Sequence, residues 1–276
     1  MNKEISKLKP VRYFRYATGL RSFKIYRGML YTLSYRGFGL SKMNNSPTIH
    51  KMEKHVFTDM FVTDEYVYFT TSHSCYSSTI DSFKLEHICG IDQLSVYTTQ
   101  SNRLILGNKD GIMVYNGVKQ VHDYIFADKY GIVSDIKSQE DDILIGTESG
   151  KIVRVSIENR KEDVIISCGK SIIKFVTSGD LIYVLTTDLS GYEIMKITAD
   201  NKVLGRLKLS EYPFGIVEYR SAILIQFEYS IAFFDDNLEP IGQKTSHIQI
   251  KQISIEKDAC FIGYSCGLIE QVLLNK

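Results

Sequence analysis

Short runs of apolar residues recur along the whole chain at a nearly constant spacing. The second to fourth positions of these runs are apolar in nearly every copy, which is typical of strands covered on both faces. Successive runs start 37 to 41 residues apart. We therefore predict seven central strands, starting near residues 29, 66, 103, 142, 181, 222 and 259. The runs are MLYTLS at Met29, YVYFTT at Tyr66, RLILGN at Arg103, DILIGT at Asp142, LIYVLT at Leu181, AILIQF at Ala222 and ACFIGY at Ala259.

Each central strand is predicted to be the second strand of a four-stranded unit. An apolar strand such as FKIY or IKFV precedes it, a polar turn separates the two, and a third strand such as IMVYN or IAFFD follows. A more polar fourth strand ends the unit, for example EDVIIS or VLGRLKL. Seven such antiparallel units predict an all-β fold, a seven-bladed β-propeller that forms a single domain over residues 1–276.

The two ends of the chain complement each other in this pattern. The last unit reaches Leu274 after only three strands, whereas VRYFRY (Val11 to Tyr16) precedes the first unit. We predict that the N-terminal segment, residues 1–16, supplies the missing outer strand of the last blade. This pairing leaves no long strand edge exposed.

One repeat, ILIGTESGKI, has glycines that suggest a phosphate-binding loop. Such a loop needs GxxxxGK followed by Ser or Thr, but here three residues separate Gly146 from Gly150, and Ile152 follows Lys151. We interpret both glycines as structural, one at the end of a central strand and one in the tight turn after it, where positive φ favours glycine.

The composition agrees with an all-β protein, since 18 Tyr and 14 Phe accompany only 4 Pro. Neither a signal-peptide core nor an apolar stretch of about 18 residues is visible, so no membrane partner is predicted. The five cysteines are odd in number and lack CxxC spacing, which argues against a disulfide framework and a zinc site. A reducing compartment, the cytoplasm or the nucleus, is expected.

The charge is strongly polarised along the chain, although the net formal charge is only +1. Residues 1–54 contain twelve Lys or Arg and two acids, so the rest of the chain is acidic. In the propeller, these basic residues fall in the first blade and the outer strand of the last, where they would contact RNA phosphates or an acidic protein partner. The alternative is that they are merely solvated. The candidate binding residues are Arg12, Arg15, Arg21, Lys24, Arg27 and Arg36.

No catalytic constellation stands out. The six histidines show neither HxH nor HExxH spacing, and in His73-Ser74-Cys75 adjacent residues are expected to point apart. No convergent pair can be selected from the acidic residues. We predict a protein that is not an enzyme, with no catalytic residues, no metal, no cofactor and no small-molecule substrate; a propeller hydrolase remains the alternative.

The period, the strand order and the third strands resemble those of the WD40 family. Phe234-Asp235 and Tyr115-Asn116 stand where that family usually has Trp-Asp, but neither Trp-Asp nor Gly-His occurs, so the resemblance is degenerate although it covers the whole chain. It implies an interaction platform: a scaffold subunit of an intracellular complex whose partners are other protein subunits, with RNA as a second partner.

A second resemblance concerns FADKYG, from Phe126. It is similar to a stretch in the WD40 subunit of the eukaryotic tRNA guanine-N7 methyltransferase, although here it falls between an outer and an inner strand. It leaves open the alternative of a direct RNA-binding accessory subunit of an RNA-modifying enzyme.

Overall fold

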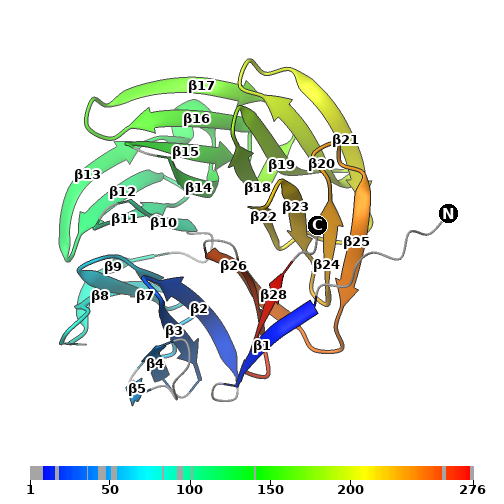
Figure 1. Ribbon diagram of the computed structural model, residues 1–276. Coiled ribbons are helices and arrows are strands. Elements are labelled where there is room, and N and C mark those ends of the chain that lie inside the picture. Colours follow the sequence, from blue (N-terminus) through cyan, green and yellow to red (C-terminus); the bar gives the residue numbers. More distant parts are fainter. Residues whose placement is uncertain are drawn as a thin grey trace. The chain divides into compact units, whose positions relative to one another are not determined.

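The computed structural model describes residues 9–15, 19–35, 37–42, 48–50, 55–82, 84–91, 96–100, 102–139, 141–256 and 259–273. These residues divide into two compact units. Unit 1 comprises Met1–Met60 and Glu211–Lys276, and unit 2 comprises Phe61–Ser210. Figure 1 shows the strands of both units.

Seven four-stranded antiparallel sheets, here called blades 1 to 7, make up the described structure. Unit 1 holds blades 1, 6 and 7. Blade 1 is β2 (Leu20–Tyr26), β3 (Met29–Ser34), β4 (Gly37–Lys42) and β5 (Thr48–His50). Blade 6 is β22 (Gly215–Tyr219), β23 (Ala222–Gln226), β24 (Ser230–Phe234) and β25 (Pro240–Thr245). Blade 7 is β26 (Ile250–Glu256), β27 (Ala259–Tyr264), β28 (Leu268–Leu273) and β1 (Lys9–Arg15).

Unit 2 holds blades 3, 4 and 5 and all of blade 2 except the start of β6. Blade 2 is β6 (Asp59–Val62), β7 (Tyr66–Thr70), β8 (Ser74–Thr79) and β9 (Glu86–Gly90). Blade 3 is β10 (Val96–Gln100), β11 (Arg103–Gly107), β12 (Gly111–Asn116) and β13 (Lys119–Ile125). After the short helix α1 (Ala127–Tyr130), blade 4 is β14 (Val133–Gln139), β15 (Asp142–Thr147), β16 (Lys151–Ser156) and β17 (Lys161–Ser167). Blade 5 is β18 (Ser171–Ser178), β19 (Leu181–Asp188), β20 (Gly191–Thr198) and β21 (Val203–Leu209).

The second strand of every blade begins at the residue predicted from the apolar pattern. These strands start at residues 29, 66, 103, 142, 181, 222 and 259, and their interior positions are almost all buried. The outer strands are more open: in β21, exposed and half-buried positions alternate along most of the strand. The predicted seven-bladed β-propeller is therefore confirmed.

The pairing of the two chain ends is also confirmed. Strand β1 lies antiparallel to β28, with Arg12 opposite Gln271 and Arg15 opposite Leu268. Figure 1 shows β1, in blue, beside the red strand β28. The sheet order β1-β28-β27-β26 completes blade 7 with a strand from the start of the sequence.

Apolar side chains fill the space between neighbouring blades within each unit. In unit 1, Phe23 of blade 1 packs with Phe261 and Ile269 of blade 7. In unit 2, Val114 of blade 3 packs with Ile145 of blade 4. Burial of such side chains stabilises the fold by about 1.5–3 kcal/mol each. Blade 4 is apolar on both faces because it contacts blade 3 on one face and blade 5 on the other.

In four of the described blades a β-bulge lies near the start of the innermost strand, and the residue at which pairing resumes is polar. The register shifts before Ser22, Asp135, Lys174 and Gln252. In unit 2, Asp135 Oδ2 accepts a hydrogen bond from the Phe175 amide at 3.1 Å. In unit 1, Gln252 Oε1 accepts one from the Phe23 amide, also at 3.1 Å. In both cases the side chain at the bulge of one blade accepts a hydrogen bond from an amide just past the bulge of the neighbouring blade. That amide therefore has a hydrogen-bond partner.

The two glycines of ILIGTESGKI have different structural reasons. Gly150 has φ +82° in the turn between β15 and β16, as predicted for a tight turn. Gly146 lies within β15, where an added Cβ would come within 3.1 Å of Ile172 and Phe175 side-chain atoms. Close approach of blade 5, not backbone conformation, therefore requires glycine at position 146. In the described part of the chain, no helix has the length and apolar character needed to span a membrane.

Candidate functional site

The turn between β19 and β20 is held by a network of charged side chains. Asp188 Oδ1 accepts hydrogen bonds from the Ser190 amide at 2.7 Å and the Ser190 hydroxyl at 2.5 Å. Its other oxygen pairs with Lys170 Nζ at 2.9 Å. Gly191, with φ +115°, permits the return into β20. The backbone of this turn is thus fixed from both sides.

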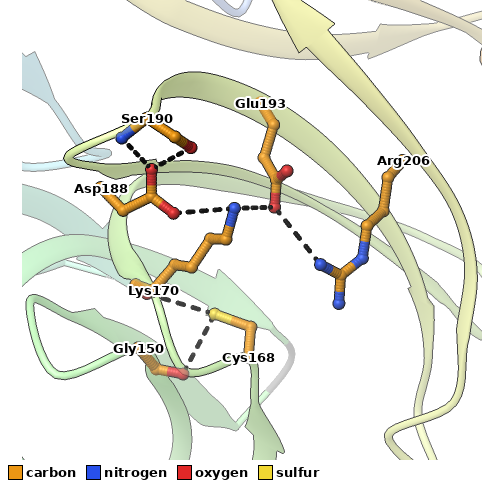
Figure 2. A network of polar contacts seen from close by, with 7 residues as sticks. All are labelled: Gly150, Cys168, Lys170, Asp188, Ser190, Glu193 and Arg206. Atoms are coloured by element: carbon orange, nitrogen blue, oxygen red, sulfur yellow. Dashed lines mark hydrogen bonds and ion pairs between the residues drawn. The ribbon is translucent and has the colours of Figure 1, made fainter.

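Lys170 links this turn to a second carboxylate, that of Glu193 on β20. Figure 2 shows its ammonium group between Asp188 and Glu193. Lys170 Nζ lies 3.0 Å from Glu193 Oε1, and Arg206 Nη1, from β21, lies 3.8 Å from the same oxygen. We call Lys170, Asp188, Ser190, Glu193 and Arg206 the blade 5 clamp.

The electrostatics of the blade 5 clamp favour permanent ion pairs. A hydrogen bond from the Ser190 hydroxyl, and to a smaller extent one from Lys170, holds the pKa of Asp188 well below its usual value. The pKa of Lys170 is raised by its hydrogen bond to Asp188 and, to a smaller extent, by the one to Glu193. Near neutral pH the carboxylate therefore stays ionised and the amine protonated, so neither is poised to exchange a proton during catalysis. The clamp is suited to holding backbone in place.

Cys168 attaches a neighbouring turn to the clamp. Its thiol donates to the carbonyl oxygens of Gly150 at 3.2 Å and Lys170 at 3.3 Å. Burial raises the pKa of this thiol, which disfavours a reactive thiolate. The contact thus connects the β15–β16 turn with the loop that carries Lys170, as Figure 2 shows.

The clamped turn presents an apolar side chain to solvent. Leu189, between Asp188 and Ser190, is fully exposed. A single exposed leucine is common on protein surfaces. Here, however, the side chain stands on a backbone that is already ordered, so binding through it would cost little further conformational entropy.

In unit 1, three adjacent loops carry a larger group of exposed apolar side chains. Tyr212 and Phe214 precede β22, Tyr229 lies between β23 and β24, and Ile248 lies between β25 and β26; the three aromatic side chains are about half exposed. The rings of Tyr212 and Phe214 pack edge to face, with centroids 5.0 Å apart. We call these four residues the blade 6 loop surface.

Backbone–backbone hydrogen bonds and a hydrogen bond between side chains connect these loops. The Ser246 amide donates to the Tyr229 carbonyl at 2.8 Å, and the Phe214 amide donates to the Gln226 carbonyl at 2.8 Å. Gln249 Nε2 donates to Glu228 Oε1 at 3.1 Å. The exposed apolar side chains thus share one connected backbone framework.

The structure separates the candidate basic residues that it describes. Arg21 donates from Nη1 to the Phe57 carbonyl at 2.8 Å, and its guanidinium lies 4.0 Å from the Tyr35 ring centroid. Arg27 lies six residues further on, in the β2–β3 turn, over Tyr26. A strand rises about 3.3 Å per residue, so these two side chains start roughly 20 Å apart. Lys24 is half-buried between them on β2.

The remaining basic candidates are only partly placed. Arg12 and Arg15 lie on β1, where the structure gives the backbone alone, and Arg36 lies outside the described residues. Several aromatics that alternate with them in sequence are core residues: Phe23, Tyr31 and Phe38 are buried and cannot stack on bases. The binding role of the basic residues stays a prediction.

The candidate nucleophiles and metal ligands do not converge as a catalytic site in the described residues. His73 is exposed, whereas Cys75 is buried. Across residues with described positions, no group of three or more His, Cys, Asp and Glu could hold a metal ion. A polar hollow of about 430 Å³ is lined by residues of blade 4, among them Asp142 and Arg154, which form an ion pair at 4.0 Å.

Comparisons with known proteins show which fold this chain shares with solved structures. No family model and no curated protein matches the sequence. The structure is similar to BamB from Moraxella catarrhalis, with a TM-score of 0.72 and 10% identity over 97% of this chain and 98% of that one. It is also similar to the computationally designed Ika8 protein, with a TM-score of 0.66 and 9% identity over 94% and 97%. At such identities the likenesses show the propeller fold alone, which hosts many functions.

Proposed function

We propose that this chain is a non-catalytic, WD40-like propeller that acts as a protein-interaction scaffold in an intracellular multi-subunit complex, in the cytoplasm or the nucleus. The observation that carries the proposal is the blade 6 loop surface. Exposed aromatic residues are enriched where proteins bind one another, because they bury much apolar area with few rotatable bonds.

Two further features support this function. The blade 6 loop surface is held by hydrogen bonds among its own loops, so that a partner meets an ordered surface. In unit 2, the blade 5 clamp orders the turn that presents Leu189. Both features bring apolar contact area to solvent.

The test is capture of partners by the immobilised chain, with two matched surface variants. In the test variant, Tyr212→Ser, Phe214→Ser and Tyr229→Ser remove the aromatic groups of the blade 6 loop surface. In the control, Val203→Ser and Leu204→Ser remove exposed apolar groups from β21. We expect the test variant to lose the proteins that the wild type and the control both retain, because a few buried aromatics carry most interface energy.

Equal retention by all three proteins would contradict the proposal. RNA is the second candidate partner, since residues 1–54 carry a net charge of +10. Retention of RNA that weakens steeply with salt and is indifferent to the aromatic substitutions would favour that alternative.

A further inference from the structure

Two cysteines on consecutive strands of blade 2 lie side by side. Cys75 on β8 and Cys89 on β9 are directly opposite each other in the antiparallel register. Opposed residues of this kind have Cβ atoms about 4.5–5.5 Å apart, with both side chains on the same face. Cys75 is fully buried, and Cys89 is half-buried.

Blade 3 adds a third sulfur to this face. Met113 and Tyr115, two residues apart on β12, pack into the same cluster as the two cysteines. The Tyr115 hydroxyl forms a side-chain hydrogen bond with Cys89 and lies 3.5 Å from the Met113 sulfur. The Cys89 thiol and the Met113 thioether therefore lie beside one phenol oxygen, which also donates toward Gln120 Oε1 at 3.4 Å, and Cys75 packs in the same cluster.

The surroundings of these sulfurs are apolar. Tyr68 and Leu104 are buried beside them, and Ile88, Ile91 and Tyr97 pack against the same cluster. Such a pocket disfavours hard, strongly hydrated cations, whereas a soft ion gains from sulfur ligands.

We propose that Cys75, Cys89 and Met113 form a binding site for Cu(I). Thiolate and thioether ligands select this ion. Zinc, in contrast, takes four ligands in its structural sites, drawn from cysteine, histidine and carboxylate side chains. The described residues offer no group of three or more of those side chains. The half-buried Cys89 gives the ion a route from solvent.

Binding needs no change in oxidation state. Two S–H bonds break, two Cu–S bonds form, and two protons pass to solvent, while the Met113 thioether donates a lone pair without losing a proton. Tyr115 acts as a positioning residue, since its hydroxyl contacts both the Cys89 and the Met113 sulfur.

Competition with bicinchoninate for Cu(I), on the reduced full-length chain without oxygen, tests the site. We expect the wild type to remove one equivalent of Cu(I) from the chelator. Cys89→Ser should weaken binding on the order of 100-fold and Met113→Leu about 10-fold, since each removes one ligand. Cys266→Ser is the matched control, because this exposed thiol lies outside the cluster, and it should bind as the wild type does.

Three results would overturn the site: no competition by the wild type, undiminished binding by Cys89→Ser, or loss of binding in Cys266→Ser. Met113→Leu keeps the volume and apolar character of the core, so the prediction stays testable even where a cysteine variant fails to fold. The alternative is a disulfide between the two cysteines. In that case the reduced chain binds no Cu(I), and its mass falls by two hydrogens on oxidation.

Discussion

Two aspartates of unit 2, Asp135 and Asp188, form similar ion pairs in very different surroundings. Asp135 is 4% exposed, pairs with Lys137 at 3.3 Å and Lys174 at 3.7 Å, and accepts the Phe175 amide. Asp188 pairs with Lys170 at 2.9 Å, but a third of its side chain is in water. The shorter ion pair is therefore the more exposed one.

Burial decides what each aspartate contributes. Removing Asp135 would leave a backbone amide between blades without its acceptor, and two lysines without their counterion. Removing Asp188 would release a turn into water, where solvent replaces each lost contact. The bulge contact of Asp135 therefore holds neighbouring blades together, whereas the blade 5 clamp orders an exposed surface.

Loss of the buried Asp135 carboxylate should lower the stability of the chain more than loss of Asp188. Asp135→Ala should lower the free energy of unfolding by about 2 kcal/mol, because it leaves the buried Phe175 amide without its acceptor. Urea unfolding of wild type and variant measures the difference. Asp135→Asn is the matched variant: its amide oxygen can still accept the Phe175 N–H, so we expect a smaller loss. Equal stability of wild type and Asp135→Ala would refute the assigned role.

The exposed aspartate should give a much smaller effect. Asp188→Asn should shift Tm by at most about 2 °C, since exposed ion pairs contribute little. Its pKa is lowered on folding, chiefly by the Ser190 hydroxyl and then by Lys170. The contribution is therefore present above the ordinary aspartate pKa and is lost as pH falls through the folded value.

Lys170 has the opposite pH dependence, because its pKa is raised by Asp188 and Glu193. Its contribution is present below the ordinary lysine pKa and is lost as pH rises through the folded value. The small Tm difference between wild type and Asp188→Asn should thus be constant from about pH 5 to pH 9 and disappear in acid. Thermal scans across this range measure it, and a difference that changes near pH 7 would contradict the assignment.

The sequence predicted the blades well because their signal is local. A strand covered on both faces needs consecutive apolar residues, and Ile143 to Ile145 or Ile223 to Ile225 display that requirement directly. The pairing of β1 with β28 was predictable for a different reason, since the last blade was one strand short.

The candidate site was not predicted because its signal is spread over blades and turns. Lys170, Asp188, Glu193 and Arg206 come from four separate elements and share no spacing motif. The sequence did contain one signal for the clamped turn, the tetrapeptide Asp188-Leu189-Ser190-Gly191. Asp and Gly are typical turn residues, so this tetrapeptide indicates a tight turn that carries Leu189. The sulfur cluster was missed in the same way, since only strand pairing brings Cys75 opposite Cys89.

Hydrogen–deuterium exchange of the chain, alone and bound to a captured partner, tests the scaffold function most directly. The proposal predicts slower amide exchange on binding in residues 211–214, 227–229 and 246–249, which carry the blade 6 loop surface. Protection confined to β1 and β2, with those three loops unchanged, would contradict it and place the interaction on the basic N-terminal strands.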